Sequence, residues 1–325
     1  MKSTVTKKKA RARSAAQTHR AKTASNWRVR CANDLQIVEA PRLARFDWLA
    51  HGFSTRVGGT SAFSSTNGAG NGHSLLNLGF TDWDSRESVT ENRKRFFRAI
   101  GADGMPVVTL RQIHSDIVHR VSGASADAHG NLPKGDALFA AEEGVVLAVQ
   151  TADCIPILLV ETKKKAVAAI HAGWRGTLRR IAEKTIGRMQ MELGTDPNDV
   201  IAALGPGIRR CCYEVGHEVA REFAAQFPNA REWFEGPFDA VSAGNNDPNW
   251  LPWLTMKPPG HAPPSARVHL DLIAANRAIL VNAGVPAEHI SDSGFCTSCR
   301  TDLFFSYRRD RTTGRMMAAV GITRA

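Results

Sequence analysis

The sequence predicts an α+β fold in which a mixed β-sheet core is flanked by helices. Apolar, strand-like runs dominate the middle of the chain, and segments with a helical period lie between and around them. Such an arrangement favours mixed or antiparallel sheets. No glycine-rich fingerprint follows the first expected strand, which argues against a dinucleotide-binding fold.

The expected strands are rich in β-branched and apolar residues. The run GVVLAVQTADC is almost continuously apolar, as expected of a buried strand, and IPILLVE, TKKK and AVAAIHAG predict a strand, a turn and a strand. The expected strands cover residues 51–59, 107–121, 144–154, 155–161 and 166–173, with a further strand and loop over 200–208. Residues 303–322 are expected to close the chain as a hairpin around TTG.

Helical periods and end signals predict helices over 84–100, 178–193, 217–227 and 270–284. Asp84 or Ser85 can cap the first of these helices, and Gly284 is a typical residue to end the last. Residues 60–79 are rich in Gly, Ser and Asn and are expected to form a loop.

The N-terminal segment and the rest of the chain differ in charge. Residues 1–33 hold ten of the 42 Lys and Arg residues and no acidic residue, so 32 bases remain against 31 acids in the rest of the chain. We therefore expect residues 1–33 to be a disordered basic tail. Residues 34–325 are expected to form a single domain, with a proline-rich surface insert at 235–266.

The tail is expected to be a solvated extension, with a transit peptide and an anchor for nucleic acid or an anionic membrane as alternatives. Because the remainder is nearly neutral, the net charge of +11 does not favour a nucleic-acid partner. No run of 18 apolar residues predicts a membrane span. The six cysteines, without an apolar secretion signal, are expected to be reduced thiols in the cytoplasm.

Three separated residues, His114, Cys154 and His171, are candidate metal ligands in strand-like surroundings. Two imidazoles and a thiolate can make a tetrahedral site with one open position, as catalytic zinc requires. The alternatives are a hydrogen-bonded core histidine and an inert buried thiol. The segment HAGWRG favours the ligand interpretation, because its glycines allow a bound molecule to approach the backbone closely.

Five further residues are candidates for binding the substrate. Trp174 can stack on a planar base, and Arg175 can pair with an anion. Arg56, which precedes two glycines, can form an oxyanion cradle or an ordinary turn. With a period of two, Gln112 shares a strand face with His114. Asp153 can orient a metal-bound histidine or cap the next turn.

Four other cysteines form two sequence pairs. Cys296 and Cys299 make a CxxC, which without a second such pair is at most half of a metal site. Cys211 and Cys212 are adjacent, and vicinal cysteines rarely chelate one metal well. We interpret all four as structural or incidental. The zinc deaminase signature H-x-E…P-C-x-x-C is absent.

Together these motifs resemble a known family over about residues 48–323. The segments HGFSTRVGG, LRQIHSDIV, VQTADCIPILL, AAIHAGWRGTL, ALGPGIRRCCYEVG and FCTSCRTDLFFSYRRDRTTGR occur in the family's order. The chain is similar to the laccase-like multicopper polyphenol oxidoreductase domain family, now described as purine nucleoside phosphorylases, which includes the mammalian laccase-domain-containing protein. The basic tail, the long proline-rich insert and the second cysteine of the CxxC depart from the family pattern.

The resemblance implies that His114, Cys154 and His171 are metal ligands and catalytic residues, and that the single domain is an enzyme. The implied substrates are adenosine, inosine and methylthioadenosine with phosphate, and the implied second activity is adenosine deamination. The implied cofactor is Zn²⁺ or Cu²⁺, because an older description has the family oxidising polyphenols. The implied fold is similar to the catalytic domain of a cytotoxic necrotizing toxin.

Two alternative functions stay open from the residues themselves. Cys154 can be a nucleophile activated by His114 or His171, giving a hydrolase or amidase, with cell-wall peptides as one possible class of substrate. A copper-dependent polyphenol oxidase is also compatible with a His₂Cys ligand set. However, the chain has 11 histidines and no His-x-His pair, which argues against a multicopper centre.

Overall fold

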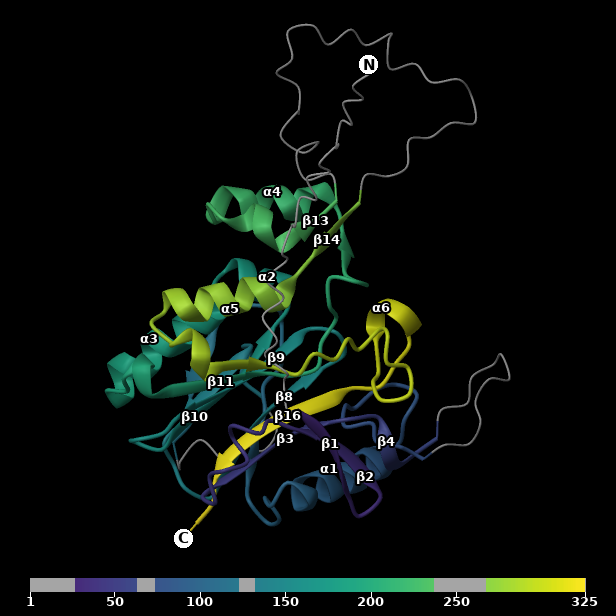
Figure 1. Cartoon of the computed structure of the whole chain (residues 1–325). Helices are drawn as coiled ribbons and strands as arrows, with labels where there is room; N and C mark the ends of the chain where they lie inside the picture. Colours follow the sequence, from purple (N-terminus) through teal and green to yellow (C-terminus); the bar gives the residue numbers. More distant parts are fainter. Residues whose placement is uncertain (1–26, 63–73, 123–131, 237–266, 325) are drawn as a thin grey trace, which may run out of the picture.

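Helices and two β-sheets form four stacked layers in the computed structural model, which describes residues 27–62, 74–122, 132–236 and 267–324 (Figure 1). Helix α1 (Arg86–Ala99) covers the outer face of the first sheet. Helices α2 (Trp174–Leu178), α3 (Ile181–Leu193) and α5 (Leu272–Asn282) cover the outer face of the second. The predicted α+β class with a mixed sheet core is therefore confirmed.

Both large sheets are mixed and have six strands among the described residues. The first has the order β1 (Arg28–Ala32), β2 (Leu35–Glu39), β3 (Leu49–Ser54), β16 (Met316–Ile322), β8 (Val145–Thr151) and β5 (Val107–Val108). The second has the order β15 (Ile290–Asp292), β11 (Val200–Leu204), β9 (Ile155–Glu161), β10 (Ala166–Ala172), β7 (Ala137–Ala140) and β6 (Val118–Arg120).

Smaller elements lie around this sandwich. A third sheet has the order β12 (Glu214–Val215), β14 (Val268–Leu270) and β13 (Phe234–Glu235), and it lies beside α4 (His217–Gln226) (Figure 1). Strand β4 (Val57–Ser61) follows β3, and α6 (Tyr307–Asp310) precedes β16. No helix of the described residues is long and apolar enough to cross a membrane.

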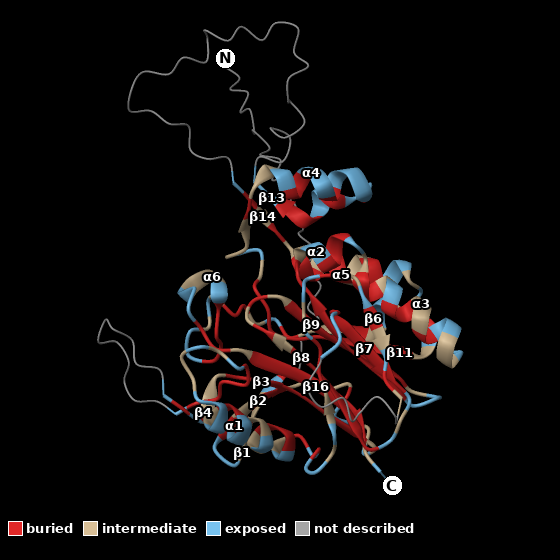
Figure 2. Ribbon diagram, turned by 180° about the vertical axis from the view of Figure 1, so that it is seen from behind, coloured by how far each residue is buried: buried red, intermediate tan, exposed pale blue. Residues whose placement is uncertain are grey.

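The central strands are apolar on both faces because each sheet separates two cores (Figure 2). Along β10, Ala168 and Ile170 pack toward the helices, whereas Val167 and Ala169 pack toward the first sheet. Strand β8 alternates in the same way between the other sheet and α1. Burial on both faces explains why these strands are nearly continuous apolar runs in the sequence.

Several predicted elements are confirmed. Strands β9 and β10 form the expected antiparallel hairpin, with Ala166 opposite Glu161. The side chain of Ser85 caps α1 by accepting a hydrogen bond from the Ser88 amide. Helix α5 ends two residues before Gly284, whose φ of 94° is a conformation that favours glycine.

The predicted strand over 107–121 is wrong. Only Val107–Val108 and Val118–Arg120 are strands, and they belong to different sheets. Between them the chain turns at His114, where φ is 57°. Gln112 and His114 therefore do not share a strand face. A turn of this kind depends on a distant partner that the local sequence does not reveal.

The predicted C-terminal hairpin is also wrong. Phe304 and Phe305 pack in the core between the sheets, and Ser306 then caps the short helix α6 by accepting a hydrogen bond from the Arg309 amide. Strand β16 pairs with β3 and β8 and not with a hairpin partner. Capping and core packing prevail here over the strand propensity of the aromatic run.

Three boundaries need correction. The predicted tail extends too far, because β1 (Arg28–Ala32) pairs with β2, while residues 1–26 lie outside the described residues. The predicted helix over 178–193 is split, because Arg180 adopts a φ of 60° between α2 and α3. The predicted proline-rich insert at 235–266 falls mostly on residues 237–266, which also lie outside the described residues.

Candidate metal centre and pocket

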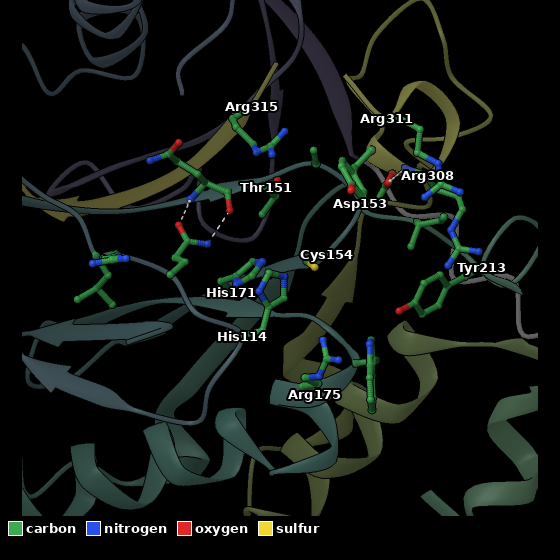
Figure 3. A pocket seen from close by; sticks show the side chains of 18 residues that line it. His114, Thr151, Asp153, Cys154, His171, Arg175, Tyr213, Arg308, Arg311 and Arg315 are labelled. Carbon is green, nitrogen blue, oxygen red and sulfur yellow. Dashed lines mark hydrogen bonds between the residues drawn. The ribbon is translucent and has the colours of Figure 1, made fainter. Parts of the chain in front are cut away.

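The three candidate ligands meet where the chain passes between the two sheets. Cys154 lies in the bend that connects β8 to β9, and His114 lies in the segment that connects β5 to β6. His171 is near the end of β10. One ligand atom from each residue lies within 4.8 Å of the others, and the two imidazole rings are 4.9 Å apart (Figure 3). The structure thus brings together three residues that are far apart in the sequence.

The carboxylate of Asp136 organises two of these ligands, although the side chain is fully buried. Its Oδ1 lies 2.9 Å from His171 Nδ1 and accepts the His114 amide. Its Oδ2 accepts the amides of Ile113 and Ser115 and the Ser115 hydroxyl. Because the hydrogen bond with Asp136 occupies Nδ1 of His171, Nε2 is the ring atom that remains to bind a metal. A carboxylate in this position fixes the ring and raises its basicity.

The charges of the site are strongly coupled. Burial raises the pKa of the Cys154 thiol, but the charge of His171 and a hydrogen bond with His114 lower it to about 6. Burial lowers the pKa of His171, whereas Cys154 and Asp136 raise it to about 9. Burial raises the pKa of Asp136, but hydrogen bonds from His171 and Ser115 lower it to about 2. A thiolate is therefore favoured at neutral pH, as a metal ligand requires.

The donor set fits a tetrahedral Zn²⁺ ion with one position facing a pocket. Gly173 leaves room for this arrangement, because a Cβ atom there would lie 2.9 Å from Cys154 Sγ and 3.2 Å from His114 Cδ2. Its φ of −78° suits any residue. The glycine is therefore required for space and not for backbone conformation.

The triad opens into a cavity of about 730 Å³. Arginines and aromatic side chains line much of it, and in Figure 3 Arg175 and Arg315 lie on opposite sides of the triad. The guanidinium of Arg175 lies over the Trp174 ring, and that of Arg308 lies over the Tyr213 ring. The arginine, tryptophan and tyrosine residues of the lining are Arg111, Trp174, Arg175, Tyr213, Tyr307, Arg308, Arg311 and Arg315.

Gln112 and Asp153 line the cavity, but their polar atoms form hydrogen bonds with other parts of the protein. The Gln112 side chain donates to the Gln150 carbonyl and accepts the Gln150 amide, which ties the His114 segment to the end of β8. Asp153 accepts hydrogen bonds from the Thr297 hydroxyl and the Arg308 amide. The expectation that Asp153 orients a histidine is wrong, because Asp136 does so.

The predicted phosphate role of Arg56 is not supported by its position. Arg56 does not line the cavity; its guanidinium lies 5.1 Å from the centre of the Phe305 ring and donates to the Thr301 carbonyl. Gly58 near it has a φ of 91° and packs against the backbone of Asp34. Gly58 and Gly59 lie within strand β4, so the RxGG segment leads into a strand and does not form an oxyanion cradle at the cavity.

The sequence reasoning missed Asp136 and most of the arginines. Asp136 directly precedes the apolar run ALFA, and a carboxylate beside a buried strand needs partners. This signal in the sequence could have identified Asp136. Arg308, Arg311 and Arg315 come from a segment that was expected to be a hairpin, so their convergence on the cavity depends on the folded structure.

Comparison with known proteins identifies the family. Residues 50–323 match the family described as multi-copper polyphenol oxidoreductase laccase. The chain belongs to this family. A relative from Deinococcus radiodurans, named purine nucleoside phosphorylase, is 37% identical over 296 residues, which cover 90% of this chain and 95% of the relative. A second relative, named adenosine deaminase RL5 and from an unknown prokaryotic organism, is 35% identical and covers 79% of this chain and 91% of the relative.

Solved structures of two similar proteins have the same fold. The crystal structure of YlmD from Geobacillus stearothermophilus superposes with a TM-score of 0.71 at 32% identity, covering 91% of this chain and 98% of that chain. A Bacillus licheniformis protein, YfiH, gives a TM-score of 0.73 at 30% identity, covering 91% and 99%. The expected family is thus confirmed, while the likeness to the toxin domain stays a prediction.

Replacing Asp136 by Asn is expected to weaken Zn²⁺ binding about 10–100-fold, because the variant loses the charge that orients His171. The affinity can be measured by competition with a chromogenic chelator. Ser115→Ala is the matched control, since it removes one hydrogen bond to the same carboxylate and leaves its charge. Equal affinities of Asp136→Asn and the wild type would contradict the role assigned to the carboxylate.

Gly173→Ala is expected to lower the metal content of the purified protein, because the new methyl group would crowd the sulfur of Cys154. The change in melting temperature should be small, since the backbone conformation suits alanine. Gly187→Ala in α3 is the control, because nothing lies within 4 Å of its Cβ position. A Gly173→Ala protein with normal metal content would show that the site has more room than this geometry allows.

Proposed function

We propose that this protein is a purine nucleoside phosphorylase that acts on adenosine, inosine and methylthioadenosine and also deaminates adenosine. The observation that carries the proposal is the presence of the His114–Cys154–His171 triad and several arginines in one cavity. The names of similar proteins, which include purine nucleoside phosphorylases and an adenosine deaminase, support it.

The aromatic side chains of the cavity suit a purine base. Trp174 and Tyr213 both line it, and each ring has a guanidinium over one face. Planar bases stack on such rings with a gain of about 1–3 kcal/mol per base. A cavity of about 730 Å³ is within the usual range for small-molecule sites. We therefore assign base binding to Trp174 and Tyr213.

The arginines suit phosphate. No carboxylate of the described residues forms an ion pair with Arg175, Arg311 or Arg315, so their charges are available to an anion. Guanidinium groups bind phosphate oxygens through paired, charge-assisted hydrogen bonds. In phosphorolysis they would hold phosphate facing the anomeric carbon of the ribose, where an oxygen attacks and the bond to the base breaks.

The triad would hold the metal. His114, Cys154 and His171 are the proposed ligands and catalytic residues, with the Nδ1 proton of His171 kept on the Asp136 side by the carboxylate. When bound, Zn²⁺ supplies a Lewis acid that activates water near neutral pH, which suits deamination of the purine. Gln112 and Asp153 act as positioning residues, because their hydrogen bonds hold the segments that carry His114 and Arg308.

Zinc is proposed in preference to copper. A multicopper oxidase needs several histidine ligands in clusters, and the described residues contain no other group of ligands that includes a histidine. The polyphenol oxidase in the family description therefore has less support from this chain's own residues than the nucleoside enzyme.

A cysteine hydrolase is the second candidate, because one observation favours it. Cys154, His171 and Asp136 form a thiol–imidazole–carboxylate series in which the pKa of the thiol is lowered to about 6. This is the arrangement of an activated cysteine nucleophile. The two candidates differ in their need for metal and in whether the substrate becomes attached to Cys154.

Incubation of the zinc-loaded protein with adenosine and phosphate is expected to release adenine and ribose 1-phosphate, with inosine as a second product. Cys154→Ser should lose at least about a hundredfold in rate, since one metal ligand is replaced by a weaker one. Liquid chromatography measures all three products. If the metal-free protein retains full activity and an adduct forms at Cys154, the hydrolase replaces the phosphorylase as the best interpretation.

Arg175→Ala is expected to raise the KM for phosphate about 10–100-fold, the equivalent of one lost charge-assisted hydrogen bond. Initial rates at varied phosphate and saturating adenosine give this constant. Arg56→Ala is the matched control, because Arg56 does not line the cavity and should leave the phosphate KM unchanged. The reverse pattern would restore the role that the sequence predicts for Arg56.

A further inference from the structure

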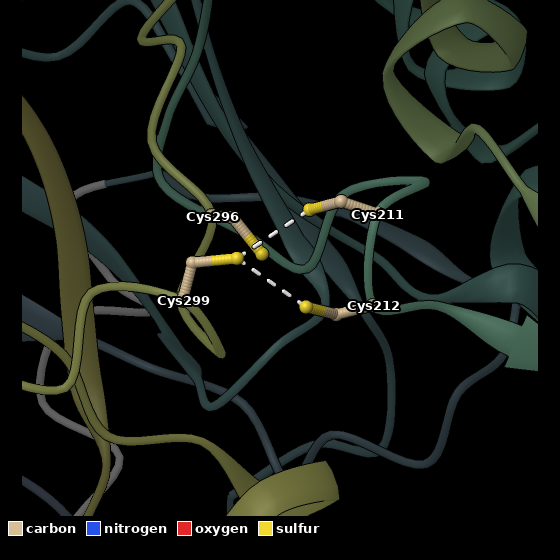
Figure 4. A group of neighbouring side chains, drawn as sticks. All are labelled: Cys211, Cys212, Cys296 and Cys299. Carbon is tan, nitrogen blue, oxygen red and sulfur yellow. Dashed lines mark hydrogen bonds between the residues drawn. The ribbon is translucent and has the colours of Figure 1, made fainter.

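Four cysteines outside the triad form a second group of possible metal ligands (Figure 4). Cys211 and Cys212 follow β11, and Cys296 and Cys299 follow β15. These two strands are parallel neighbours at the edge of the second sheet, and an isolated bridge joins Gly207 to Cys296 just beyond them. The sheet therefore brings two cysteine pairs together that are more than eighty residues apart in the sequence.

The spacing of the four sulfurs fits a single metal ion. All four Sγ atoms lie within 4.8 Å of one another, and Cys299 Sγ lies 3.5 Å from that of Cys211 and 3.3 Å from that of Cys212. Zinc–sulfur bonds of about 2.3 Å place tetrahedral ligands roughly 3.8 Å apart. A disulfide needs a sulfur–sulfur bond of about 2.05 Å, and all four cysteines are free.

Backbone amides point at one of these sulfurs. The amide groups of Arg209, Ser298 and Cys299 donate to the Cys296 sulfur. Two of these donors lie two and three residues after Cys296, inside the CxxC turn. Amide donors around a sulfur stabilise a thiolate, which is the form that binds metal.

We propose that Cys211, Cys212, Cys296 and Cys299 bind one structural Zn²⁺ ion, separate from the triad. Four protein thiolates fill a tetrahedral shell and leave no position for a substrate, as in structural zinc sites. Adjacent cysteines rarely chelate one metal well, but here the sulfurs of Cys211 and Cys212 both lie close to that of Cys299. Of the two interpretations in the sequence analysis, structural or incidental, the proposal keeps the structural one and adds a metal ion to it.

The proposed ion would fix one wall of the cavity. Tyr213, which lines the cavity, directly follows Cys212. On the other side of the ion, Thr297 lies inside the CxxC turn and donates to Asp153, the residue before Cys154. The ion would therefore link the Tyr213 wall to the segment that carries the catalytic cysteine. This site does not depend on metal binding at the triad.

The test measures zinc in the purified full-length chain by mass spectrometry of the metals. The Cys154→Ser background removes one ligand of the triad, so that zinc at the four cysteines can be measured separately. This protein is expected to keep about one zinc ion per chain, and adding Cys299→Ser should remove it. Adding Cys31→Ser instead should not, because Cys31 is exposed and belongs to neither group.

Thiol alkylation of the unmutated chain provides a second measurement that needs no variant. Cys31, Cys211 and Cys299 are all exposed, so all three should react with iodoacetamide in chelator-treated protein. In zinc-loaded protein, Cys211 and Cys299 should be protected and Cys31 should still react. Peptide mass spectrometry identifies each site.

Three results would overturn the proposal. The first is a Cys154→Ser protein without bound zinc after purification in reducing, zinc-containing buffer. The second is equal alkylation of Cys211 and Cys299 with and without zinc. The third is a disulfide from Cys299 to Cys211 or Cys212 that persists in that reducing buffer. Loss of nucleoside activity in any variant leaves the metal readout unaffected, so failure of the proposed function and failure of this site are distinguishable.

Discussion

The buried carboxylate of Asp136 is the interaction on which the site depends. A buried charge is costly unless it is fully hydrogen-bonded, and five donors surround this one. Three of them are the consecutive backbone amides of Ile113, His114 and Ser115, and these hydrogen bonds hold the turn at His114. The fourth is the Ser115 hydroxyl, and the fifth fixes the His171 ring. One side chain therefore sets the backbone of one ligand and the orientation of another.

The two-sheet architecture explains why this carboxylate can act on both histidines. Strand β7, which Asp136 precedes, pairs with β10 on one side and β6 on the other. His171 lies at the end of β10, and His114 lies just before β6. The third ligand, Cys154, arrives through the connection from the first sheet to the second. The metal centre is thus built where three neighbouring chain segments cross the same end of the sandwich.

The parts of the fold that sequence could predict are those with local causes. The β9–β10 hairpin and the cap of α1 follow from apolar runs, a turn and a capping serine. The turn at His114 and the helix at Tyr307–Asp310 could not be predicted, because their causes are Asp136 and core packing of Phe304 and Phe305. The triad was expected from its sequence context and the resemblance, whereas its supporting carboxylate and the arginines needed the tertiary structure.

Asp153 shows how the remaining parts are coupled. Its carboxylate accepts the Thr297 hydroxyl at one oxygen and the Arg308 amide at the other, and its own φ is 96°. A non-glycine residue with this conformation is strained and persists only where its surroundings hold it. The CxxC turn and the start of α6 supply that restraint through these two hydrogen bonds. The restrained conformation of Asp153 in turn places Cys154, the next residue, at the triad. The geometry of the triad is therefore determined partly by segments that contribute no ligand to it.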